Sequence, residues 1–299
     1  MFKRYFWLFA ILLLMFTACS EQPLGTRRNP IKLYFVPSME ANKIITSAEA
    51  IKDFLHQDTG LFFKVGVPTS YAAVIEAMGT DETDIAFLAT FAYVMAHEKY
   101  NAQVELTTVR NHLSAYRGQF VANVNSGVNS IEDIEGKVIA YTDAASTSGY
   151  IYPSAILKQN NIKPKKEIMA GGHPQVILAV YEQNADVGCT FWSEEREGKP
   201  YDARSSVEET HPDVYEKVKI IGFTDWIPND TVTFRDKFPA DLKEKIVNSL
   251  LKYAEDPEGQ KELQALYNVD GFIRSSDSDY NIVRETLETL GMDANELFK

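Results

Sequence analysis

The stretch VIAYTDAASTSGYIYPSAILKQ, residues 138–159, shows how this chain passes from one kind of secondary structure to the next. Residues 138–142 form a short apolar run that predicts a β-strand, and residues 149–159 have the apolar spacing of a helix. Three consecutive hydroxyl residues, Ser146, Thr147 and Ser148, lie between the strand and the helix. Where such strand–helix units follow one another, the strands form a parallel-type sheet that helices cover. The stretch therefore indicates the α/β class.

Strands and helices alternate along most of the chain on both sides of this stretch. The predicted strands cover residues 31–36, 61–67, 84–88, 119–124, 138–142, 167–170, 185–190, 218–222 and 230–234. The predicted helices cover residues 46–57, 70–78, 91–99, 131–137, 149–159, 173–183, 240–253, 257–266 and 277–290. A second series of strands begins after Tyr116, with no detectable sequence repeat of the first.

This order predicts two lobes, each a sheet flanked by helices. We expect lobe 1 to consist of residues 31–117 and 225–299, with lobe 2, residues 118–224, inserted between them. Two connecting segments would then form a hinge. In such folds ligands bind in the cleft, where helix N-termini and the carboxyl ends of strands converge, and the lobes close around the ligand.

The first 19 residues have the features of a secretory signal peptide. Lys3 and Arg4 precede an apolar run at 5–16 that is too short to span a bilayer comfortably. The run ends in Phe16-Thr17-Ala18-Cys19, which resembles a bacterial lipobox, with Phe16 in place of the usual aliphatic residue. We expect Cys19 to carry a lipid that anchors an extracytoplasmic protein to a membrane; the alternative is an ordinary signal peptide with a chance cysteine. Residues 20–30 then predict a polar tether.

Composition and charge exclude several classes of protein. A hydrophobic content of 45% with 24% charged residues excludes overall disorder. The net charge is −12, and it becomes −14 when the signal peptide takes Lys3 and Arg4 with it. So acidic a chain is a poor partner for nucleic acid, and an anionic ligand must be held by local dipoles. Cys189 has no second cysteine to pair with after processing, and we expect it to be a small buried hydrophobe.

The hydroxyl turn at Ser146, Thr147 and Ser148 is the strongest candidate for a binding site. A helix N-terminus presents free N–H groups and a partial positive charge, which together bind anions. Each hydrogen bond to a charged group contributes about 1.5–3 kcal/mol, so five or six of them offset the dehydration of a small oxyanion without any lysine or arginine. The alternative is a simple N-cap made by one serine.

Four further residues are candidates because of their positions at the ends of predicted elements. His173 opens a helix after Gly171-Gly172, where it would be a donor to an anion or a plain surface residue. Tyr71 and Tyr93 lie near the starts of two helices, where packing is the alternative to ligand contact. Asp186 begins a strand; it would select a protonated oxyanion if it faces the cleft, and otherwise it is a solvated turn residue.

No metal, cofactor or catalytic motif is found. The other histidines are scattered, without the spacing of zinc ligands or a nearby cysteine. The sequence has neither a Gly-x-Ser-x-Gly elbow nor a phosphate-binding Walker loop. We therefore expect a binding protein with no metal and no cofactor, and not an enzyme.

From Ile31 to about Leu290, the chain resembles the phosphate/phosphite/phosphonate-binding proteins of ABC importers. The resemblance rests on an ordered set of motifs that covers nearly the whole chain after the tether. These motifs are the Tyr71-led helix, Asp84-Ile85-Ala86-Phe87-Leu88 before Ala92-Tyr93, Ser146-Thr147-Ser148-Gly149-Tyr150 with Pro153, Gly172-His173, Ala185-Asp186-Val187 and Ile227-Pro228-Asn229-Asp230.

The resemblance implies a type II periplasmic-binding-protein fold and a set of ligand-binding residues. The implied pocket residues are Tyr71, Tyr93, Ser146, Thr147, Ser148, His173 and Asp186. It also implies capture of a small oxyanion for an ABC permease in the membrane, by a protein expected to be a monomer.

Two departures from the family pattern concern the ligand. Ala89-Thr90 stands where members often have Gly-Pro, so Thr90 either donates to the ligand or caps its helix. Pro174 follows the histidine where members expected to take aminoalkylphosphonates tend to have an acidic residue. We therefore expect phosphate, phosphite or methylphosphonate to bind better than an amino-bearing phosphonate. Trp192 either lines the wall of the pocket or packs against other side chains without contacting the ligand.

Two alternatives keep the same fold and change the role. The protein would be a sensor that presents bound ligand to a receptor, or it would bind another small solute such as a pyrimidine or a sulfonate. The second alternative predicts aromatic clamping of the ligand, with the hydroxyls of residues 146–148 dispensable.

Overall fold

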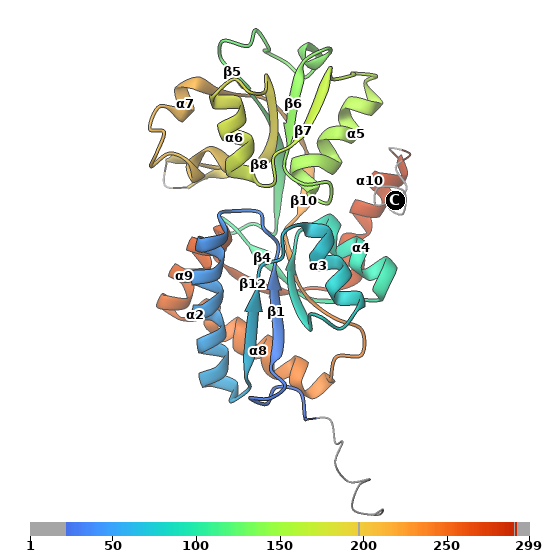
Figure 1. Ribbon diagram of the computed structural model, residues 1–299, viewed down its shortest axis with the longest axis vertical. Coiled ribbons are helices and arrows are strands. Elements are labelled where there is room, and N and C mark those ends of the chain that lie inside the picture. Colours follow the sequence, from blue (N-terminus) through green and yellow to red (C-terminus); the bar gives the residue numbers. More distant parts are fainter. Residues whose placement is uncertain (1–21, 197, 290, 292–299) are drawn as a thin grey trace, which may run out of the picture.

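A computed structural model describes residues 22–196, 198–289 and 291 and shows two lobes, one above the other in Figure 1. The predicted signal peptide and Cys19 lie outside the described residues. In the part of the chain that is described, no helix is long and apolar enough to cross a membrane.

Lobe 1 is built on a mixed six-stranded sheet in the order β12-β4-β11-β3-β1-β2. β1 pairs in parallel with β2 and β3, whereas β11 and β12 are antiparallel to their neighbours. The strands are β1 (Ile31–Phe35), β2 (Phe63–Gly66), β3 (Ile85–Leu88), β4 (Gln103–Val109), β11 (Thr231–Phe234) and β12 (Gly271–Arg274). The helices of this lobe are α2 (Ala41–Thr59), α3 (Tyr71–Gly79), α4 (Thr90–Tyr100), α8 (Ala240–Glu255) and α9 (Pro257–Tyr267).

The helices cover both faces of this sheet with apolar stripes. On α2, for example, Ile44, Ile51 and Leu55 recur at helical spacing and are fully buried. They pack with the β1 residues Leu33 and Phe35 in the core shared with α8 and α9. Burying these side chains contributes about 1.5–3 kcal/mol each and gives the cleft a rigid support.

Lobe 2 is built on a second mixed sheet, in the order β10-β5-β8-β6-β7, with β9 paired to β8. β6 is parallel to β7 and β8, and β5 is antiparallel to β8 and β10. The strands are β5 (Ala115–Asn123), β6 (Val138–Tyr141), β7 (Lys166–Met169), β8 (Val187–Arg196), β9 (Lys199–Asp202) and β10 (Val218–Pro228). The helical elements are η2 (Glu132–Ile134), η3 (Thr147–Ile151), α5 (Tyr152–Gln159), α6 (His173–Tyr181), η4 (Ala203–Ser206) and α7 (Val214–Lys217).

These two mixed sheets with flanking helices confirm the predicted α/β class. Most predicted elements lie where they were expected, but β4, β9 and β12 were not predicted. Cys189 is fully buried, and its burial raises the pKa of the thiol well above its ordinary value.

The chain passes between the two sheets twice. The first passage, at residues 110–114, joins β4 to β5, and the second, at residues 229–230, joins β10 to β11. The boundaries predicted at 117/118 and 224/225 therefore fall inside β5 and β10. Those two strands pair with each other as far as Ala115 and Pro228, so both belong to lobe 2 throughout.

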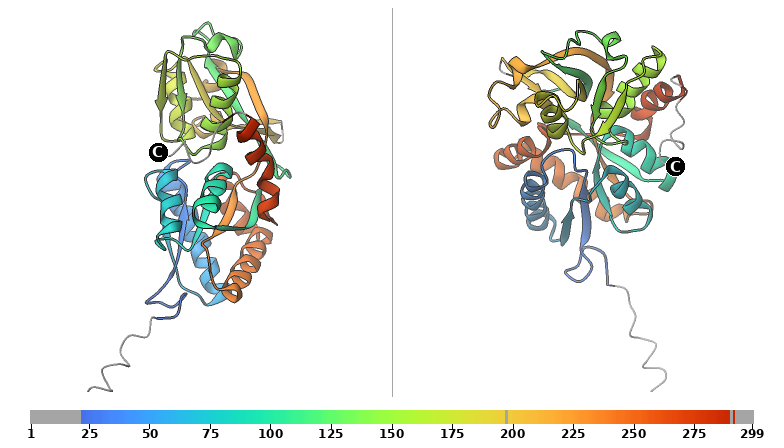
Figure 2. Two further views of the ribbon diagram at one scale, coloured as in Figure 1. Left: turned by 90° about the vertical axis from the view of Figure 1, so that its right-hand side faces the viewer. Right: turned by 45° about the horizontal axis from the view of Figure 1, so that its top comes forward.

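The helix α10 (Asn281–Thr289), preceded by the turn η5 (Asp277–Tyr280), lies across the junction of the lobes (Figure 2). It packs against α4 of lobe 1. The Tyr152 hydroxyl at the start of α5 in lobe 2 lies 3.4 Å from the hydroxyl of Thr286 on α10. This helix therefore touches both lobes.

The predicted tether is wrong for the residues that the structure describes in it. Leu24 packs on the lobe 1 core, and the Gly25 carbonyl accepts a hydrogen bond from the N–H of Phe62 at 2.8 Å. Gly25 also donates to the Asn29 carbonyl at 2.8 Å, which closes a turn. The segment was predicted to be a tether because it is polar, but Leu24 and the hydrogen bond from Phe62 dock it on lobe 1.

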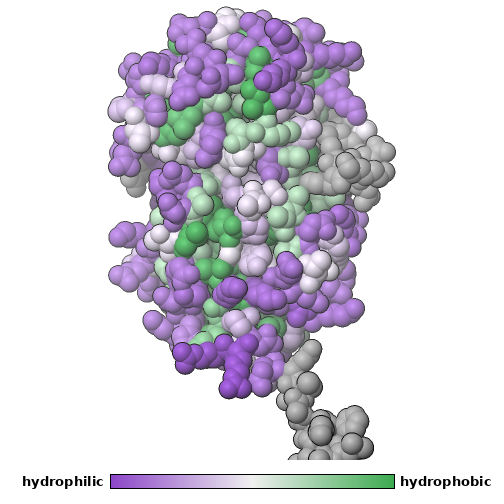
Figure 3. All heavy atoms as spheres, in the orientation of Figure 1, coloured by the Kyte–Doolittle hydropathy of each residue, from purple (hydrophilic) through white to green (hydrophobic). Residues whose placement is uncertain are grey.

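On the face of the molecule drawn in Figure 3, hydrophilic residues cover the rim, and more hydrophobic residues gather toward the middle, where the lobes meet.

Candidate functional site

A cavity of about 50 Å³ lies between the lobes, at the carboxyl ends of the parallel strands. Lobe 1 contributes Val36 and Ala89, which directly follow β1 and β3, and Tyr71, the first residue of α3. Lobe 2 contributes Ser146 and Ser148 after β6 and His173, the first residue of α6, after β7. Predicted site residues of both lobes meet here because the parallel strands of each sheet end at the same edge, which faces the other lobe.

The hydroxyl turn after β6 forms one wall of the cavity. The Ser146 hydroxyl accepts from the Gly149 N–H at 3.1 Å, and its carbonyl accepts from the N–H groups of Tyr150 and Ile151, both at 3.0 Å. The second of these bonds spans five residues and widens the first turn of the helix, a distortion found frequently at functional sites. A Cβ on Gly149 would lie 2.0 Å from the Thr142 hydroxyl, so only glycine allows this turn.

Thr147 has a different role from its two neighbours. Its hydroxyl accepts from the N–H of Phe91, in the first turn of α4, at 2.8 Å. In addition, the carboxylate of Asp143 in the same turn accepts from the N–H of Tyr71 at 3.4 Å. Lobe 2 therefore supplies hydrogen-bond acceptors for two helix N-termini of lobe 1. Thr147 joins the lobes and is not among the residues that line the cavity.

His173 lines the cavity and is 6% exposed. Burial, together with the charge of Arg110, lowers the pKa of its imidazole to about 3, so the ring is neutral at neutral pH. Nδ1 is buried and has no hydrogen-bond partner among the described residues. The Phe191 ring packs edge-on against the imidazole at 4.9 Å, and the backbone N–H of His173 donates to Ser38 of lobe 1 at 3.2 Å. His173 is therefore a neutral side chain with unused hydrogen-bonding capacity at the cavity.

Three tyrosines, Tyr71, Tyr116 and Tyr267, bring phenol groups to the cavity. Burial, followed by the charge of Asp230, raises the pKa of all three. Each therefore keeps its proton at neutral pH, and that of Tyr267 is donated to the Val36 carbonyl at 2.7 Å. Only Tyr71 was predicted; Tyr116, the second residue of β5, and Tyr267, the last residue of α9, lie where the sequence shows no motif.

Thr90 is fully buried behind the cavity wall. Its hydroxyl donates to the carbonyl of Pro228, the last residue of β10, at 2.6 Å. Hydrogen bonds from Ser148 and Thr90 also oppose the rise in the pKa of Tyr116. The structure thus places Thr90 beside Tyr116 and not in the cavity lining.

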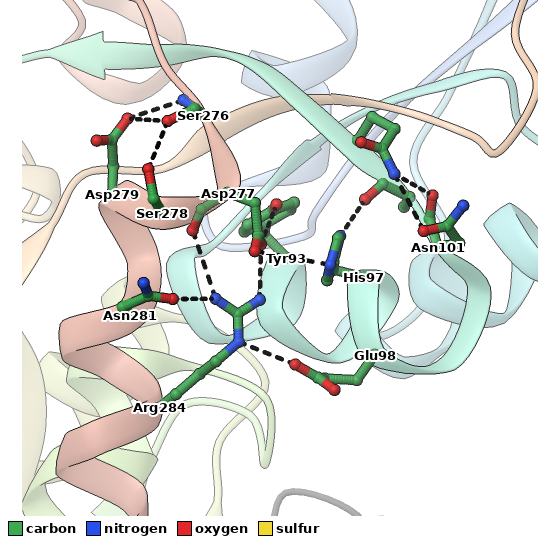
Figure 4. Close-up of polar contacts among 12 residues, drawn as sticks. Tyr93, His97, Glu98, Asn101, Ser276, Asp277, Ser278, Asp279, Asn281 and Arg284 are labelled. Carbon is green, nitrogen blue, oxygen red and sulfur yellow. Dashed lines mark hydrogen bonds and ion pairs between the residues drawn. The ribbon is translucent and has the colours of Figure 1, made fainter.

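The structure does not bring Tyr93 to the cavity. Its hydroxyl donates to the Asp277 carboxylate at 2.7 Å, and Arg284 on α10 also binds Asp277 at 2.6 Å (Figure 4). Burial alone would raise the pKa of Asp277, but the hydrogen bonds from Tyr93 and Arg284 outweigh it and lower that pKa. Tyr93 lies three residues after the first residue of α4, nearly one helical turn away from the end that faces the cleft. Its bond to Asp277, which also binds Arg284, joins α4 to the C-terminal helix.

Asp186 is also away from the cavity. It precedes β8, which runs parallel to β6, and its carboxylate accepts from the N–H of Val138, the first residue of β6, at 2.9 Å. The cavity lies at the other end of β6, roughly 13 Å further along the four-residue strand. The predicted role of Asp186 in selecting a protonated ligand therefore does not fit its position.

Arg110 and Asp230 line the cavity and were not predicted. Arg110 Nη2 lies 2.5 Å from Asp230 Oδ2, and Arg110 Nε donates to the Tyr267 carbonyl at 2.8 Å. Burial alone would lower the pKa of Arg110, but the Asp230 carboxylate raises it. The expectation of a pocket without any cationic side chain is therefore wrong, although this cation is paired. The sequence offered no signal for this residue, because β4, the strand that precedes Arg110, was not predicted.

Trp192 packs outside the cavity, with its ring edge-on to Phe223 at 5.0 Å. In the described part of the chain, no group of three His, Cys, Asp or Glu side chains could hold a metal ion. The arrangement as a whole offers hydroxyl, phenol and imidazole donors around a space for a few heavy atoms.

Comparison with known proteins places these features in a family. The family described as "ABC transporter, phosphonate, periplasmic substrate-binding protein" matches residues 33–280. The phosphate-import protein PhnD of Mycolicibacterium smegmatis is 27% identical over 202 residues, and the match covers 61% of this chain and 63% of that protein. The phosphonates-binding periplasmic protein of Escherichia coli is 27% identical over 204 residues, and the match covers 66% of this chain and 58% of that protein. The matched part thus spans about three fifths of the length of these curated relatives.

Two solved structures share the fold over most of the chain. The binding protein component of an ABC phosphonate transporter from Pseudomonas aeruginosa has a TM-score of 0.78 at 23% identity, covering 91% of this chain and 87% of that one. PhnD1 from Prochlorococcus marinus, solved with methylphosphonate, has a TM-score of 0.75 at 15% identity, covering 88% and 98%. These likenesses confirm the predicted fold, and the family description, a substrate-binding protein, confirms the expectation of a binding protein and not an enzyme.

Proposed function

The chain belongs to the family of periplasmic substrate-binding proteins of phosphonate ABC transporters, and we propose on that premise that its cavity captures a small tetrahedral phosphorus oxyanion for import. Phosphate, phosphite and methylphosphonate are the candidate ligands. Two relatives, one named for phosphate import and one for phosphonate binding, support this ligand class.

The observation that carries the proposal is the helix start after β6 with its buried hydroxyls. Ser146 and Ser148 are 2% and 1% exposed and line the cavity, where the N-terminus of a helix adds a partial positive charge. Tyr71 and neutral His173 face the same space from two other elements. Donors from several directions suit an anion whose oxygens point to the corners of a tetrahedron.

The size of the cavity supports a ligand of few atoms. One water needs about 10–15 Å³ of such space, so a cavity of about 50 Å³ holds about three to five water-sized groups. Phosphate, with four groups around one central atom, is of this size. A pyrimidine ring with its substituents is larger.

The test is a thermal-shift screen of the purified protein against phosphate, phosphite, methylphosphonate, sulfate, a simple sulfonate and a pyrimidine. A ligand at 100 times its Kd adds about 2.7 kcal/mol of stability, which raises Tm by several degrees. We expect the phosphorus oxyanions to stabilise the protein most, with Kd values then measured by calorimetry. Stabilisation by the pyrimidine or the sulfonate alone would contradict the proposal.

The attachment and the partners belong to the same proposal. A lipid on Cys19 would hold the protein at the membrane that contains the permease, and the protein would deliver its ligand as a monomer. Replacing Cys19 by serine is expected to release the protein from the membrane fraction without changing its affinity for phosphate. Membrane association that survives Cys19→Ser would contradict anchoring at this residue.

A further inference from the structure

Two charged side chains of the cavity wall, Arg110 and Asp230, are not among the hydrogen-bond donors proposed for the oxyanion. They come from the two segments in which the chain passes between the sheets, 120 residues apart. Their side chains are 10% and 22% exposed, so both are largely removed from water. The cavity wall therefore contains a largely buried ion pair.

The guanidinium is held in place by more than the carboxylate. Its Nε donates to the Tyr267 carbonyl at 2.8 Å, and its Cζ lies 5.9 Å from the centre of the Tyr116 ring. The backbone N–H and carbonyl of Arg110 are also bonded to Leu113, both at 2.9 Å. Such a fixed, planar cation stays with its carboxylate and cannot easily swing aside for a ligand.

Asp230 is consequently neutralised from inside the protein. A buried carboxylate without a partner is strongly unfavourable and attracts any cation that can reach it. Here the position beside Asp230 already holds a guanidinium, and a ligand ammonium group would have to displace it or lie next to a like charge. The charge of Arg110 also reaches His173, since it contributes to the low pKa of that imidazole.

We propose that Arg110 is a specificity-determining residue of this cavity: as a built-in counter-ion of Asp230, it admits a compact phosphorus oxyanion and rejects one that carries an ammonium group. The inference rests on the proposed function and names the subclass of ligand. On this proposal, the pair of Arg110 and Asp230 in the two connecting segments discriminates between the ligands, and not Pro174, which follows His173.

The first test measures phosphate affinity by calorimetry in three variants. In Arg110→Gln, the carboxylate of Asp230 loses its cation and repels the anion, so we expect phosphate to bind at least tenfold more weakly. In Asp230→Asn, the guanidinium is left unneutralised and phosphate binds at least threefold more tightly. The double variant carries neither charge and is expected to lie within about threefold of the unchanged protein. Equal affinities for Arg110→Gln and the double variant would overturn the inference.

The second test compares two phosphonates of nearly equal size, ethylphosphonate and aminomethylphosphonate, which differ in a methyl and an ammonium group. The unchanged protein is expected to bind ethylphosphonate more tightly than aminomethylphosphonate. Neither ligand is expected to bind more tightly than phosphate. In Arg110→Gln, the ratio of the two affinities should move at least tenfold toward aminomethylphosphonate. Arg110→Lys keeps a cation beside Asp230 and should keep the original ratio. A ratio that Arg110→Gln leaves unchanged would contradict the inference.

A third measurement needs no phosphorus ligand. Arg110→Ala leaves a space of the shape of a guanidinium beside Asp230, so 10 mM methylguanidinium should raise its Tm. The same ion should have no such effect on Arg110→Ala combined with Asp230→Asn, and absence of the effect in both would contradict the inference. If the unchanged protein binds no phosphorus oxyanion at all, the proposed function fails, while this rescue still decides whether Arg110 holds a cation position.

Discussion

The two lobes contain equivalent pieces of structure that the protein uses in different ways. In lobe 1 the carboxylate of Asp84, just before β3, accepts from the N–H of Lys32 in β1 at 2.8 Å. In lobe 2 the carboxylate of Asp186, just before β8, accepts from the N–H of Val138 in β6 at 2.9 Å. Each aspartate joins the starts of two parallel strands, at the edge of the sheet away from the cavity.

The opposite edges of the sheets differ. The N-termini of α3 and α4 in lobe 1 donate to Asp143 and Thr147, which both belong to lobe 2. The helix start in lobe 2 instead directs Ser146 and Ser148 to the cavity. The same strand–turn–helix unit therefore closes the cleft in lobe 1 and lines it with hydroxyls in lobe 2. Because the strand–turn–helix unit is the same in both lobes, this difference comes from the residues of the turn and not from the fold.

The largest expected effect concerns the two aspartates. Asp84 is 4% exposed and also pairs with Arg235 at 2.8 Å, so Asp84→Ala removes the buried partner of a half-buried guanidinium and is expected to cost about 3 kcal/mol of unfolding free energy. Asp186→Ala loses one charged hydrogen bond and should cost about 1.5–3 kcal/mol. Urea unfolding measures both values. Neither variant should change the ranking of ligands, and a changed ranking in Asp186→Ala would restore its predicted role at the site.

The second prediction concerns pH and His173 in lobe 2. The pKa of His173 is near 3 in the folded protein and near 6.5 in the unfolded chain, so below about pH 6.5 the unfolded chain binds one proton more. Without ligand, the free energy of unfolding should therefore fall as the pH falls from about 6.5 toward 3. The slope from this group is up to about 1.4 kcal/mol per pH unit.

His173→Asn is the matched control for this pH dependence, because asparagine cannot titrate. Its stability should fall less steeply between pH 6 and 4 than that of the unchanged protein, in denaturant titrations at each pH. Parallel curves for the two proteins would show that His173 does not have the low pKa that its burial implies.

The third prediction tests whether Thr147 closes the cleft and does not bind. Thr147→Val keeps the shape of the side chain and removes the acceptor for the Phe91 N–H, at a cost of about 1 kcal/mol. This bond exists only when the lobes are together, so phosphate affinity should fall by about fivefold for every phosphorus ligand alike. A loss confined to one ligand would indicate direct contact with the ligand.

The smallest effect is expected for Tyr93, whose phenol binds Asp277 at a distance from the cavity. Tyr93→Phe should cost about 0.5–1.5 kcal/mol of stability and leave phosphate affinity within twofold. Tyr71→Phe is the matched comparison, because Tyr71 lines the cavity, and it should weaken phosphate binding. If the two variants behave alike toward phosphate, the assignment of these tyrosines to different surfaces is wrong.

Much of this organisation was predictable, because it depends on local signals. Apolar spacing predicted the buried strands and amphipathic helices, and the hydroxyl turn at 146–148 was recognisable from adjacent residues. Asp186 was misplaced although its position before the strand already put it at the edge away from the cleft. The polar strand β4, QVELTTV, was missed because only some of its side chains are buried, with Gln103 and Glu105 partly exposed.

Other features depend on contacts between distant residues. Arg110 and Asp230 come together because β4 and β11 pair side by side in the sheet. With β4 unrecognised, no sequence pattern could bring them to one place. Likewise, the contact of Tyr93 with Asp277 depends on the path of the last helix across the junction.

The central claim is that the hydroxyls at the helix start in lobe 2 hold the ligand, and phosphate calorimetry of Ser146→Ala combined with Ser148→Ala tests it most directly. The control is Ser70→Ala in lobe 1, since the Ser70 hydroxyl caps α3 by accepting from the Ala73 N–H at 3.1 Å. The control should lose about 1 kcal/mol of stability and keep its affinity. The double variant should bind phosphate at least 100-fold more weakly, and an affinity equal to that of the unchanged protein would contradict the claim.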